Sequence, residues 1–339
     1  MKRNFVHCYS EIVSVDNLLL AWGEFVKGKR DKRDVQQFQM NLMDNIFSLH
    51  FDLANQTYRH GGYKAFKVFD PKPRDIHKAS VRDRLVHHAI YRILYPFFDR
   101  IFISDSYSCR NKKGTYKALD KFQQYFYQVS QNNTRTCYYL KMDIRKFFAN
   151  IDHEILMVVL REYIGDKKCI WLLENIIGGF RSKEHTPKIR PLRSTGSIGL
   201  PLGNLTSQLL VNIYMNEFDQ FVKHRLHEKS YIRYADDFVF LSRDYKHLIN
   251  IISPIKKYLG DSLRLEVHPN KIYIQTVTSG LNFLGYVSFA DHRILRTKTK
   301  KRMFKKISED NSPSYSGLLE YCNSYKLQSA LYARSFEFL

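Results

Sequence analysis

Two adjacent acids, Asp236 and Asp237, stand inside an otherwise aromatic and aliphatic run, YIRYADDFVF, at residues 231–240. The flanking residues favour strands, whereas Asp is depleted in strands and enriched at tight turns. A third acid, Asp143, ends a similar run, YYLKMD. Because neighbouring strands lie about 4.8 Å apart, the ends of two strands can bring such carboxylates around shared ions.

Carboxylate oxygens are the ligands that Mg²⁺ prefers, usually together with substrate phosphates. Two such ions activate an attacking 3′ oxygen and stabilise a leaving pyrophosphate. We therefore expect Asp143, Asp236 and Asp237 to be catalytic residues that hold two Mg²⁺ ions, with Mn²⁺ as a substitute. A solvated Asp-rich turn is the plain alternative for the adjacent pair, and the matching context of the upstream acid argues against it.

The charge balance points to an anionic partner. The chain has 339 residues, and 54 Lys plus Arg against 33 Asp plus Glu leave a formal net charge of +21. Such an excess destabilises a compact state unless an anionic polymer neutralises it, so nucleic acid is the expected partner and an anionic membrane surface comes second. The five cysteines lack zinc-site spacing, and we find neither a signal peptide nor an apolar run of about 18 residues. These features predict a soluble cytoplasmic protein with reduced thiols.

The elements that must position the acids follow from local patterns. The first sixty residues read as helical, and the segment around residues 59–84 as a basic hairpin region of short strands. A basic loop leads into a helix before the strand that ends at Asp143, and Asp152 is the expected N-cap of the next helix. Leu210, Tyr214 and Phe218, with Phe221 and Leu226, predict a long amphipathic helix. The run at 231–240 predicts a hairpin whose turn carries the two acids, and residues 181–198 read as a loop.

Taken with its neighbours, the YADD hairpin resembles the centre of reverse transcriptases. KMDIRKFFANID, with Asp143, is similar to the upstream strand of their palm. PKPRDIHKASVRDRLVHHAI and SYSCRNKKGTYKAL resemble their fingers blocks. GLPLGNLTSQLLVNIYMNEFD resembles the template-positioning block, LEVHPNKIYIQ the following palm block, and LNFLGY the primer grip. The resemblance covers roughly residues 65–290 with every block in order.

The resemblance implies an α+β right-hand polymerase in which an antiparallel palm sheet is backed by helices. The expected parts are a helical N-terminal extension at 1–60, fingers at 61–135, a palm at 136–290 with a fingers insertion near 165–200, and a short basic helical thumb at 291–339. The implied activity is RNA-directed DNA polymerisation, which needs an RNA template, an RNA/DNA duplex and dNTPs.

Further site residues are carried over from the resemblance. The expected dNTP-binding residues are Lys72, Arg74, Arg82, Phe148, Leu202, Gly203 and Lys271. Phe148 matches the steric gate against a ribose 2′-OH, with an ordinary core Phe as its alternative. Gly203 would let the backbone approach the new base pair. Lys271 matches a Lys that protonates pyrophosphate, and a surface Lys is its alternative.

Two more groups complete the expected site. The primer-grip residues are Phe283, Leu284, Gly285 and Tyr286. The residues expected to follow nucleic-acid backbone are Arg110, Lys112, Lys113, Lys298, Lys300, Lys301 and Arg302. A solvated face is the alternative for the C-terminal group at 298–302. A solvated or structural basic face is the alternative for Lys72, Arg74, Arg82 and Arg84, above all for one of the last two.

Within the family the chain is most similar to reverse transcriptases of diversity-generating retroelements, in the bacterial or phage-encoded, group II intron-like lineage. Most relatives carry Gln at the position of Leu202 and Pro at the position of Gln208, and PLGNLTSQ departs from both. This implies relaxed fidelity, a structured RNA template and a small basic helical-bundle accessory protein. An antiphage-defence enzyme with a dedicated noncoding RNA is the alternative role.

Two other classes of function compete with polymerisation. A catalytically idle nucleic-acid-binding module would have no need of the three aspartates and Phe148. A metal-dependent nuclease could also use clustered carboxylates, but the chain shows no additional acid-rich block. P-loop and H-E-x-x-H patterns are absent from the sequence, which argues against an NTPase and a zinc protease.

Overall fold

The computed structural model describes residues 5–6, 8–69, 73–180, 197–308 and 311–336. The chain forms two compact units that interleave along the sequence. The first unit contains residues 1–103, 144–221 and 256–267, and the second contains residues 104–143, 222–255 and 268–339.

A four-stranded antiparallel sheet lies at the centre of the second unit. Its strands are β3 (Tyr138–Asp143), β4 (Tyr231–Tyr234), β5 (Asp237–Ser242) and β6 (Tyr273–Thr276), in the order β4-β5-β3-β6. Aromatic and aliphatic residues fill these strands, as their strand preference predicts. The YADD hairpin expected from the sequence is confirmed, because β4 and β5 pair directly across it.

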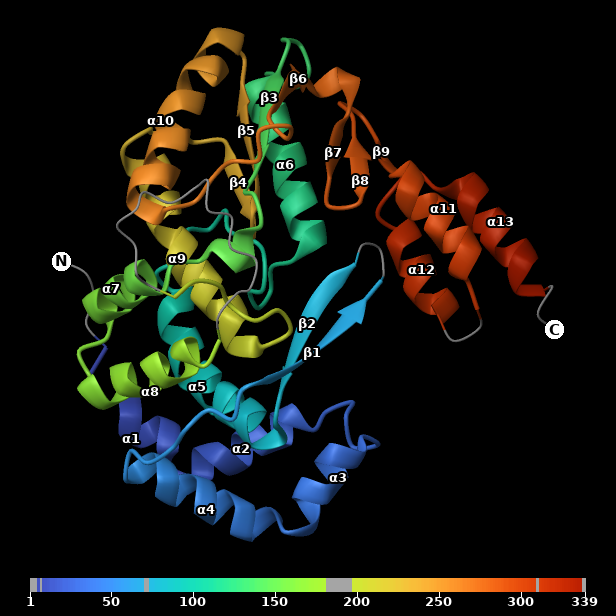
Figure 1. Cartoon of the computed structure of the whole chain (residues 1–339). Helices are drawn as coiled ribbons and strands as arrows, with labels where there is room; N and C mark the ends of the chain where they lie inside the picture. The colour runs from blue at the N-terminus through green and yellow to red at the C-terminus, as the bar shows by residue number, and fades with distance from the viewer. Residues whose placement is uncertain (1–4, 7, 70–72, 181–196, 309–310, 337–339) are drawn as a thin grey trace. The chain divides into compact units, whose positions relative to one another are not determined.

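Helices cover both faces of this sheet. Figure 1 shows α6 (Thr115–Val129) and α10 (Tyr245–Leu263) on opposite sides of it. Phe122 and Phe126 of α6 share a buried cluster with Ile232 of β4 and Val239 of β5. Alternate residues of each strand point to opposite faces, so Phe238 and Phe240 lie on the other side, where both are fully buried.

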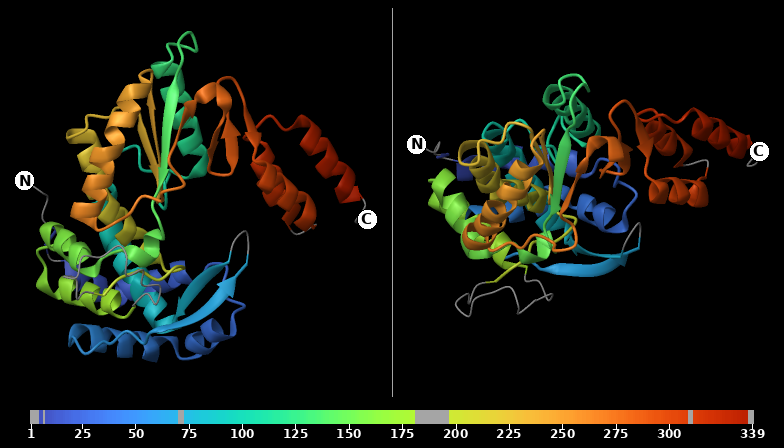
Figure 2. Two further views of the ribbon diagram at one scale, coloured as in Figure 1. Left: turned by 45° about the horizontal axis from the view of Figure 1, so that its top comes forward. Right: turned by 90° about the horizontal axis from the view of Figure 1, so that it is seen from above.

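A small sheet and three helices complete the second unit. The strands β7 (Leu281–Phe283), β8 (Tyr286–Ser288) and β9 (Arg293–Leu295) pair antiparallel after the short 3₁₀ turn Val277–Ser279. The helices α11 (Thr297–Lys306), α12 (Ser312–Leu319) and α13 (Tyr325–Phe336) follow as one group (Figure 2). Met303, Leu319 and Leu331 from these helices belong to the same buried cluster as α6.

The first unit is mostly helical. Its helices are α1 (Cys8–Val13), α2 (Val15–Phe25), α3 (Arg33–Met40), α4 (Leu42–Ala54), α5 (Val81–Asp99), α7 (His153–Tyr163) and α8 (Lys167–Gly178), with a 3₁₀ turn at Phe147–Asn150. The hairpin of β1 (Tyr63–Val68) and β2 (Arg74–Ala79) forms a separate two-stranded sheet. The long helix α9 (Leu205–His224) begins in this unit and ends in the residues of the second.

Several local predictions are confirmed. The N-terminal segment is helical from Cys8 to Ala54 except for short connections. The Asp152 carboxylate accepts hydrogen bonds from the backbone N–H groups of Glu154 and Ile155, which makes it the N-cap of α7. The long amphipathic helix is shorter than expected, because α9 ends at His224 and leaves Leu226 in the following turn. Most of the loop expected at 181–198 lies outside the described residues.

No helix in the described parts of the chain combines the length and the apolar character that a membrane crossing requires. All five cysteines are free thiols.

Candidate active site

The three aspartates meet at one end of the four-stranded sheet. Asp143 is the last residue of β3 and lies directly opposite Asp237, the first residue of β5. Side chains at opposed positions of antiparallel strands have Cβ atoms about 4.5–5.5 Å apart. Tyr234 and Asp237 pair across a two-residue turn, and Asp236 is the second residue of that turn. The structure therefore brings together the three acids that the sequence singled out.

Burial and neighbouring negative charges disfavour the charged forms of Asp236 and Asp237. Burial is the main cause that raises the pKa of Asp236 to about 6, and the charges of Asp143 and Asp237 raise it further. Burial also raises the pKa of Asp237, against the opposing effect of Lys141. Like-charged carboxylates at one site ionise together only when a cation compensates them.

Two lysines provide positive charge at this strand end. The Lys271 Nζ atom lies 2.6 Å from Asp143 Oδ1. The Lys141 Nζ atom lies 3.4 Å from Asp237 Oδ1 and donates a hydrogen bond of 3.0 Å to the Asn282 carbonyl. The sequence patterns did not single out Lys141. It stands two residues before Asp143 in β3, and residues at this spacing share one face of a sheet.

The donor set suits a hard divalent cation. Beyond the 3.4 Å ion pair with Lys141, the buried Asp237 Oδ1 atom has no hydrogen-bond partner among the described residues, so a cation could bind it in place of that ammonium group. Within the described residues, however, no group of three or more His, Cys, Asp or Glu side chains is arranged as a finished metal site. The ammonium groups of Lys271 and Lys141 contact Asp143 and Asp237 instead.

In the first unit, backbone hydrogen bonds join three segments that carry expected dNTP-binding residues. His77 of β2 donates from its backbone N–H to the Leu202 carbonyl at 3.0 Å, and Leu200 donates to the Phe148 carbonyl at 2.8 Å. Asn204 returns a side-chain hydrogen bond of 3.1 Å to the His77 carbonyl. Phe148 and Leu202 are both half-buried.

Gly203 and the hairpin strand β2 approach each other closely. Gly203 has a φ of +101°, and a Cβ atom added there would lie 3.0 Å from Ile76 Cγ2. Arg74 stands two residues before Ile76, so its side chain leaves β2 on the same face. Its guanidinium group is exposed. Lys72 lies outside the described residues.

The other basic residues have varied surroundings. Arg82 forms an ion pair with Asp52 and lies over the ring of Tyr58. Arg110 donates to the Ser106 carbonyl, and Lys113 donates to the Ser104 carbonyl, so both side chains brace their own loop. Lys112, Lys298, Lys300 and Lys301 are exposed, and Arg302 is half-buried.

The expected primer-grip residues form the tight turn between β7 and β8. Phe283 and Tyr286 pair across it and are almost fully buried. Leu284 and Gly285 occupy the two turn positions with φ values of +52° and +92°. Both positive φ values match the turn type whose twist fits antiparallel strands.

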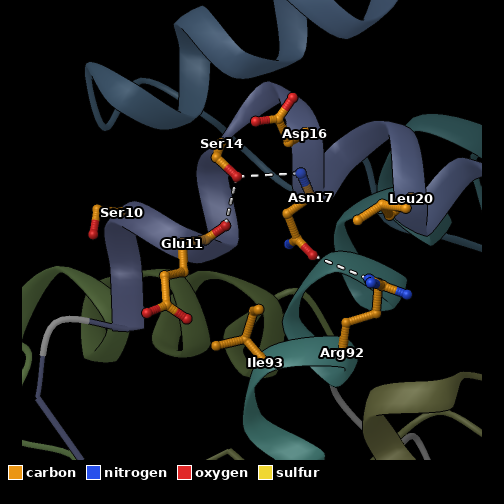
Figure 3. Close-up of a pocket in the computed structure, with 8 residues that line it drawn as sticks. All are labelled: Ser10, Glu11, Ser14, Asp16, Asn17, Leu20, Arg92 and Ile93. Atoms are coloured by element: carbon orange, nitrogen blue, oxygen red, sulfur yellow. Dashed lines mark hydrogen bonds between the residues drawn. The ribbon is translucent and has the colours of Figure 1, made fainter.

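A shallow depression of about 430 Å³ lies elsewhere, on the first unit, among α1, α2 and α5 (Figure 3). Three of its polar side chains, Ser14, Asn17 and Arg92, already have structural roles. Ser14 caps α2 by accepting a hydrogen bond from the Asn17 backbone N–H, and the Asn17 side-chain oxygen accepts one of 3.1 Å from Arg92. None of the three aspartates lines it.

In a comparison with known proteins, residues 69–288 match the model of the reverse transcriptase (RNA-dependent DNA polymerase) family. The chain is 26% identical to Protein YkfC of Escherichia coli over 75% of its own length and 74% of the relative's. It is 25% identical to the group II intron-encoded protein LtrA of Lactococcus lactis, over 70% of this chain and 39% of LtrA. It is 24% identical to a COX1/OXI3 intron 1 protein of Saccharomyces cerevisiae, over 88% of this chain and 34% of that protein.

Proposed function

The chain belongs to the reverse transcriptase family, and from this premise we propose that it copies an RNA template into DNA at Asp143, Asp236 and Asp237. The observation that carries the proposal is the register of the sheet, which sets Asp143 opposite Asp237 beside the turn that holds Asp236. The intron-encoded relatives are longer proteins, since the chain spans 34% of the yeast protein and 39% of LtrA.

The three carboxylates would hold a pair of Mg²⁺ ions, or Mn²⁺ in their place. When bound, such ions supply the charge that activates a 3′ hydroxyl and stabilises pyrophosphate. Lys271 and Lys141 would release Asp143 and Asp237 as the ions enter. Lys271 would then be free to donate a proton or a hydrogen bond to the leaving pyrophosphate.

We assign nucleotide selection to the segments joined by backbone hydrogen bonds in the first unit. Phe148 would exclude the ribose 2′-OH, and Arg74, with Lys72 and Arg82, would bind the triphosphate. Arg74 is the strongest of these candidates because its side chain is exposed, so its guanidinium group is able to bind a phosphate through two hydrogen bonds. Arg82 already has Asp52 as a partner.

We further propose that the parts follow the right-hand plan. The β3–β6 sheet would be the palm, the β1–β2 hairpin would belong to the fingers, and α11–α13 would be a small thumb. The Phe283–Tyr286 turn would hold the primer end. Exposed Lys298, Lys300 and Lys301 on α11, with Arg302, would follow the duplex backbone, since clustered cations neutralise successive phosphates.

The biological role we favour is mutagenic reverse transcription in a diversity-generating retroelement. Leu202 and Gln208 support it, because Leu202 offers the base pair only apolar shape where a Gln could donate a hydrogen bond. Under this role the enzyme would act in the cytoplasm of a bacterium on a structured RNA, with a small basic helical-bundle accessory protein. Sequencing the copurifying RNA and its cDNA distinguishes this role from antiphage defence, which predicts one dedicated noncoding RNA.

The activity itself is tested with Asp236→Asn, which preserves shape and removes the charge. We expect primer extension on an RNA template with dNTPs and Mg²⁺ to fall by on the order of a thousandfold. Asp261→Asn, an exposed carboxylate of α10, is the matched control and should extend normally. Full activity in the Asp236→Asn variant would refute the assignment, and degradation of nucleic acid without dNTPs would favour a nuclease.

A further inference from the structure

Arg233 is a fully buried cation beside the turn that carries Asp236. It lies in β4, has no exposed surface, and ranks among the largest fully buried side chains of the described chain. Its Nη1 atom donates a hydrogen bond of 3.2 Å to the Ala235 carbonyl, and its Nη2 atom donates one of 3.0 Å to Ser106 Oγ. Buried arginines are rare because removing the charge from water is costly.

The carbonyl that Arg233 holds belongs to the peptide bond between Ala235 and Asp236. This peptide is planar, so fixing its oxygen also fixes the direction in which Asp236 leaves the turn. Ala235 has a φ of +56°, in the left-handed region that favours glycine and strains other residues. The hydrogen bond from Arg233 to the Ala235 carbonyl helps to hold the turn in this conformation.

A neighbouring loop segment holds Arg233 in place. The backbone N–H of Arg233 donates a hydrogen bond of 2.9 Å to the Asp105 carbonyl. The Arg233 carbonyl accepts one of 3.0 Å from the Tyr107 N–H. Asp105 is itself buried and anchored, since its Oδ2 atom accepts from Tyr125 at 2.8 Å and lies 3.0 Å from Lys223 Nζ. The loop thus presents Ser106 to the guanidinium from a rigid base.

We propose that Arg233 is a positioning residue that locks the Ala235–Asp236 peptide, with Ser106 as its support, and so orients Asp236 toward a divalent cation. The proposal rests on the proposed function of the three aspartates. In this proposal Arg233 acts on the ion through the conformation of the turn. A guanidinium is required because its planar fork reaches two acceptors at once, whereas a lysine ammonium is a single point on a flexible stem.

The test uses the full chain and Mn²⁺ alone, measured by electron paramagnetic resonance without nucleotide or nucleic acid. Groups that orient a metal ligand typically contribute about 10- to 100-fold to metal affinity. We expect Arg233→Met and Arg233→Lys to weaken Mn²⁺ binding by roughly tenfold or more, and Ser106→Ala by less. Arg293→Met removes another largely buried guanidinium of the same unit, on β9, and should keep the parental Mn²⁺ affinity.

A second substitution separates positioning from general stability. Ala235→Gly allows the turn its positive φ without strain, so adding it to Arg233→Lys should recover part of the lost Mn²⁺ affinity. Parental Mn²⁺ affinity in Ser106→Ala and Arg233→Lys, or an equal loss in Arg293→Met, would overturn the proposal. Ser106→Ala and Arg233→Lys are mild changes that decide the question even if Arg233→Met does not fold. Primer extension by the parent is measured alongside, because its absence would instead refute the proposed function.

Discussion

Phe148 is the side chain to which we assign the choice between deoxyribonucleotides and ribonucleotides. Its backbone carbonyl accepts a hydrogen bond from Leu200, and its ring packs edge-on against Phe147 with centroids 5.5 Å apart. The backbone is therefore fixed and the ring packs against Phe147 while remaining half-exposed. A buried core Phe would leave no surface for a sugar.

Replacing Phe148 with Ala should admit ribonucleotides. Removing the ring opens space for the 2′-OH, so the ratio of kcat/KM for dNTP over rNTP should fall by on the order of a hundredfold. Single-nucleotide extension with each nucleotide measures this ratio. The neighbouring Phe147→Leu variant, altered at a buried ring, is the control and should retain the parental preference. An unchanged ratio in the Phe148→Ala variant would refute the assignment of Phe148 as the steric gate.

Leu202 should influence fidelity through its side chain alone. Its backbone carbonyl already accepts from His77, so Leu202→Gln keeps that contact and adds an amide that can hydrogen-bond near the base pair. We expect fewer misincorporations, above all opposite adenine, as the resemblance to retroelement enzymes implies. Sequencing cDNA made from a defined RNA by parent and variant measures this, and identical error spectra would contradict the expectation.

The site residues that could be predicted from the sequence are those whose type is unusual for their surroundings. The paired acids and Asp143 stand out because Asp is unusual in strands. Arg233 stands in the neighbouring strand β4, yet a single Arg does not indicate whether its guanidinium is buried or what it contacts. Its partner Ser106 is distant in the sequence, and that pairing depends on a loop path that local preferences do not specify.

At the scale of elements, Gly203 determines how closely β2 approaches the segment that follows Leu200. A side chain at 203 would face two penalties, the positive φ and a contact of 3.0 Å with Ile76 Cγ2. Gly28 provides a natural comparison, since its φ is +69° and a Cβ added there meets nothing within 4 Å.

Both Gly203→Ala and Gly28→Ala should lower the free energy of unfolding by about 1 kcal/mol because of the positive φ. Only Gly203→Ala should also raise the KM for dNTP, because it pushes β2 and Arg74 away from Leu202. Denaturant unfolding and steady-state extension measure the two effects separately. A KM increase of similar size in Gly28→Ala would show that nucleotide binding reflects stability instead of this contact.

Local elements were the most predictable part of the fold. The YADD hairpin, the N-terminal helices and the Asp152 cap follow from strand preference, periodicity and capping chemistry. The end of α9 was misplaced because an apolar stripe continues to Leu226 after the backbone has left the helix. The interleaving of the two units was not predictable, since it depends on strand pairs that are far apart in the sequence.

At the scale of the whole molecule, buried histidines connect stability to pH. Burial, with the charges of Lys29 and Arg84, lowers the pKa of His88 to about 4. Burial likewise lowers the pKa of His87 to about 3. In the unfolded chain both recover an ordinary pKa of about 6.5, so between that value and pH 4 the unfolded state binds more protons. The folded state should therefore lose stability as pH falls through this window.

His88→Phe should reduce this pH dependence. The ring contact with Phe25 can persist, and His88 Nδ1 has no hydrogen-bond partner among the described residues. Relative to the parent, the variant should gain on the order of 1 kcal/mol between pH 7.5 and pH 5, allowing for the partial exposure of the ring. Urea unfolding across this range measures the difference, and parallel curves for the two proteins would contradict the expectation.

The strand order β4-β5-β3-β6 also governs how the protein is made. On a ribosome, β3 leaves the exit tunnel with both edges unpaired, because its neighbours β5 and β6 are encoded far downstream. Sheets built from such distant segments fold slowly, and a bare apolar strand invites pairing with other nascent chains. We therefore expect the strand that ends at Asp143 to need chaperone protection during translation.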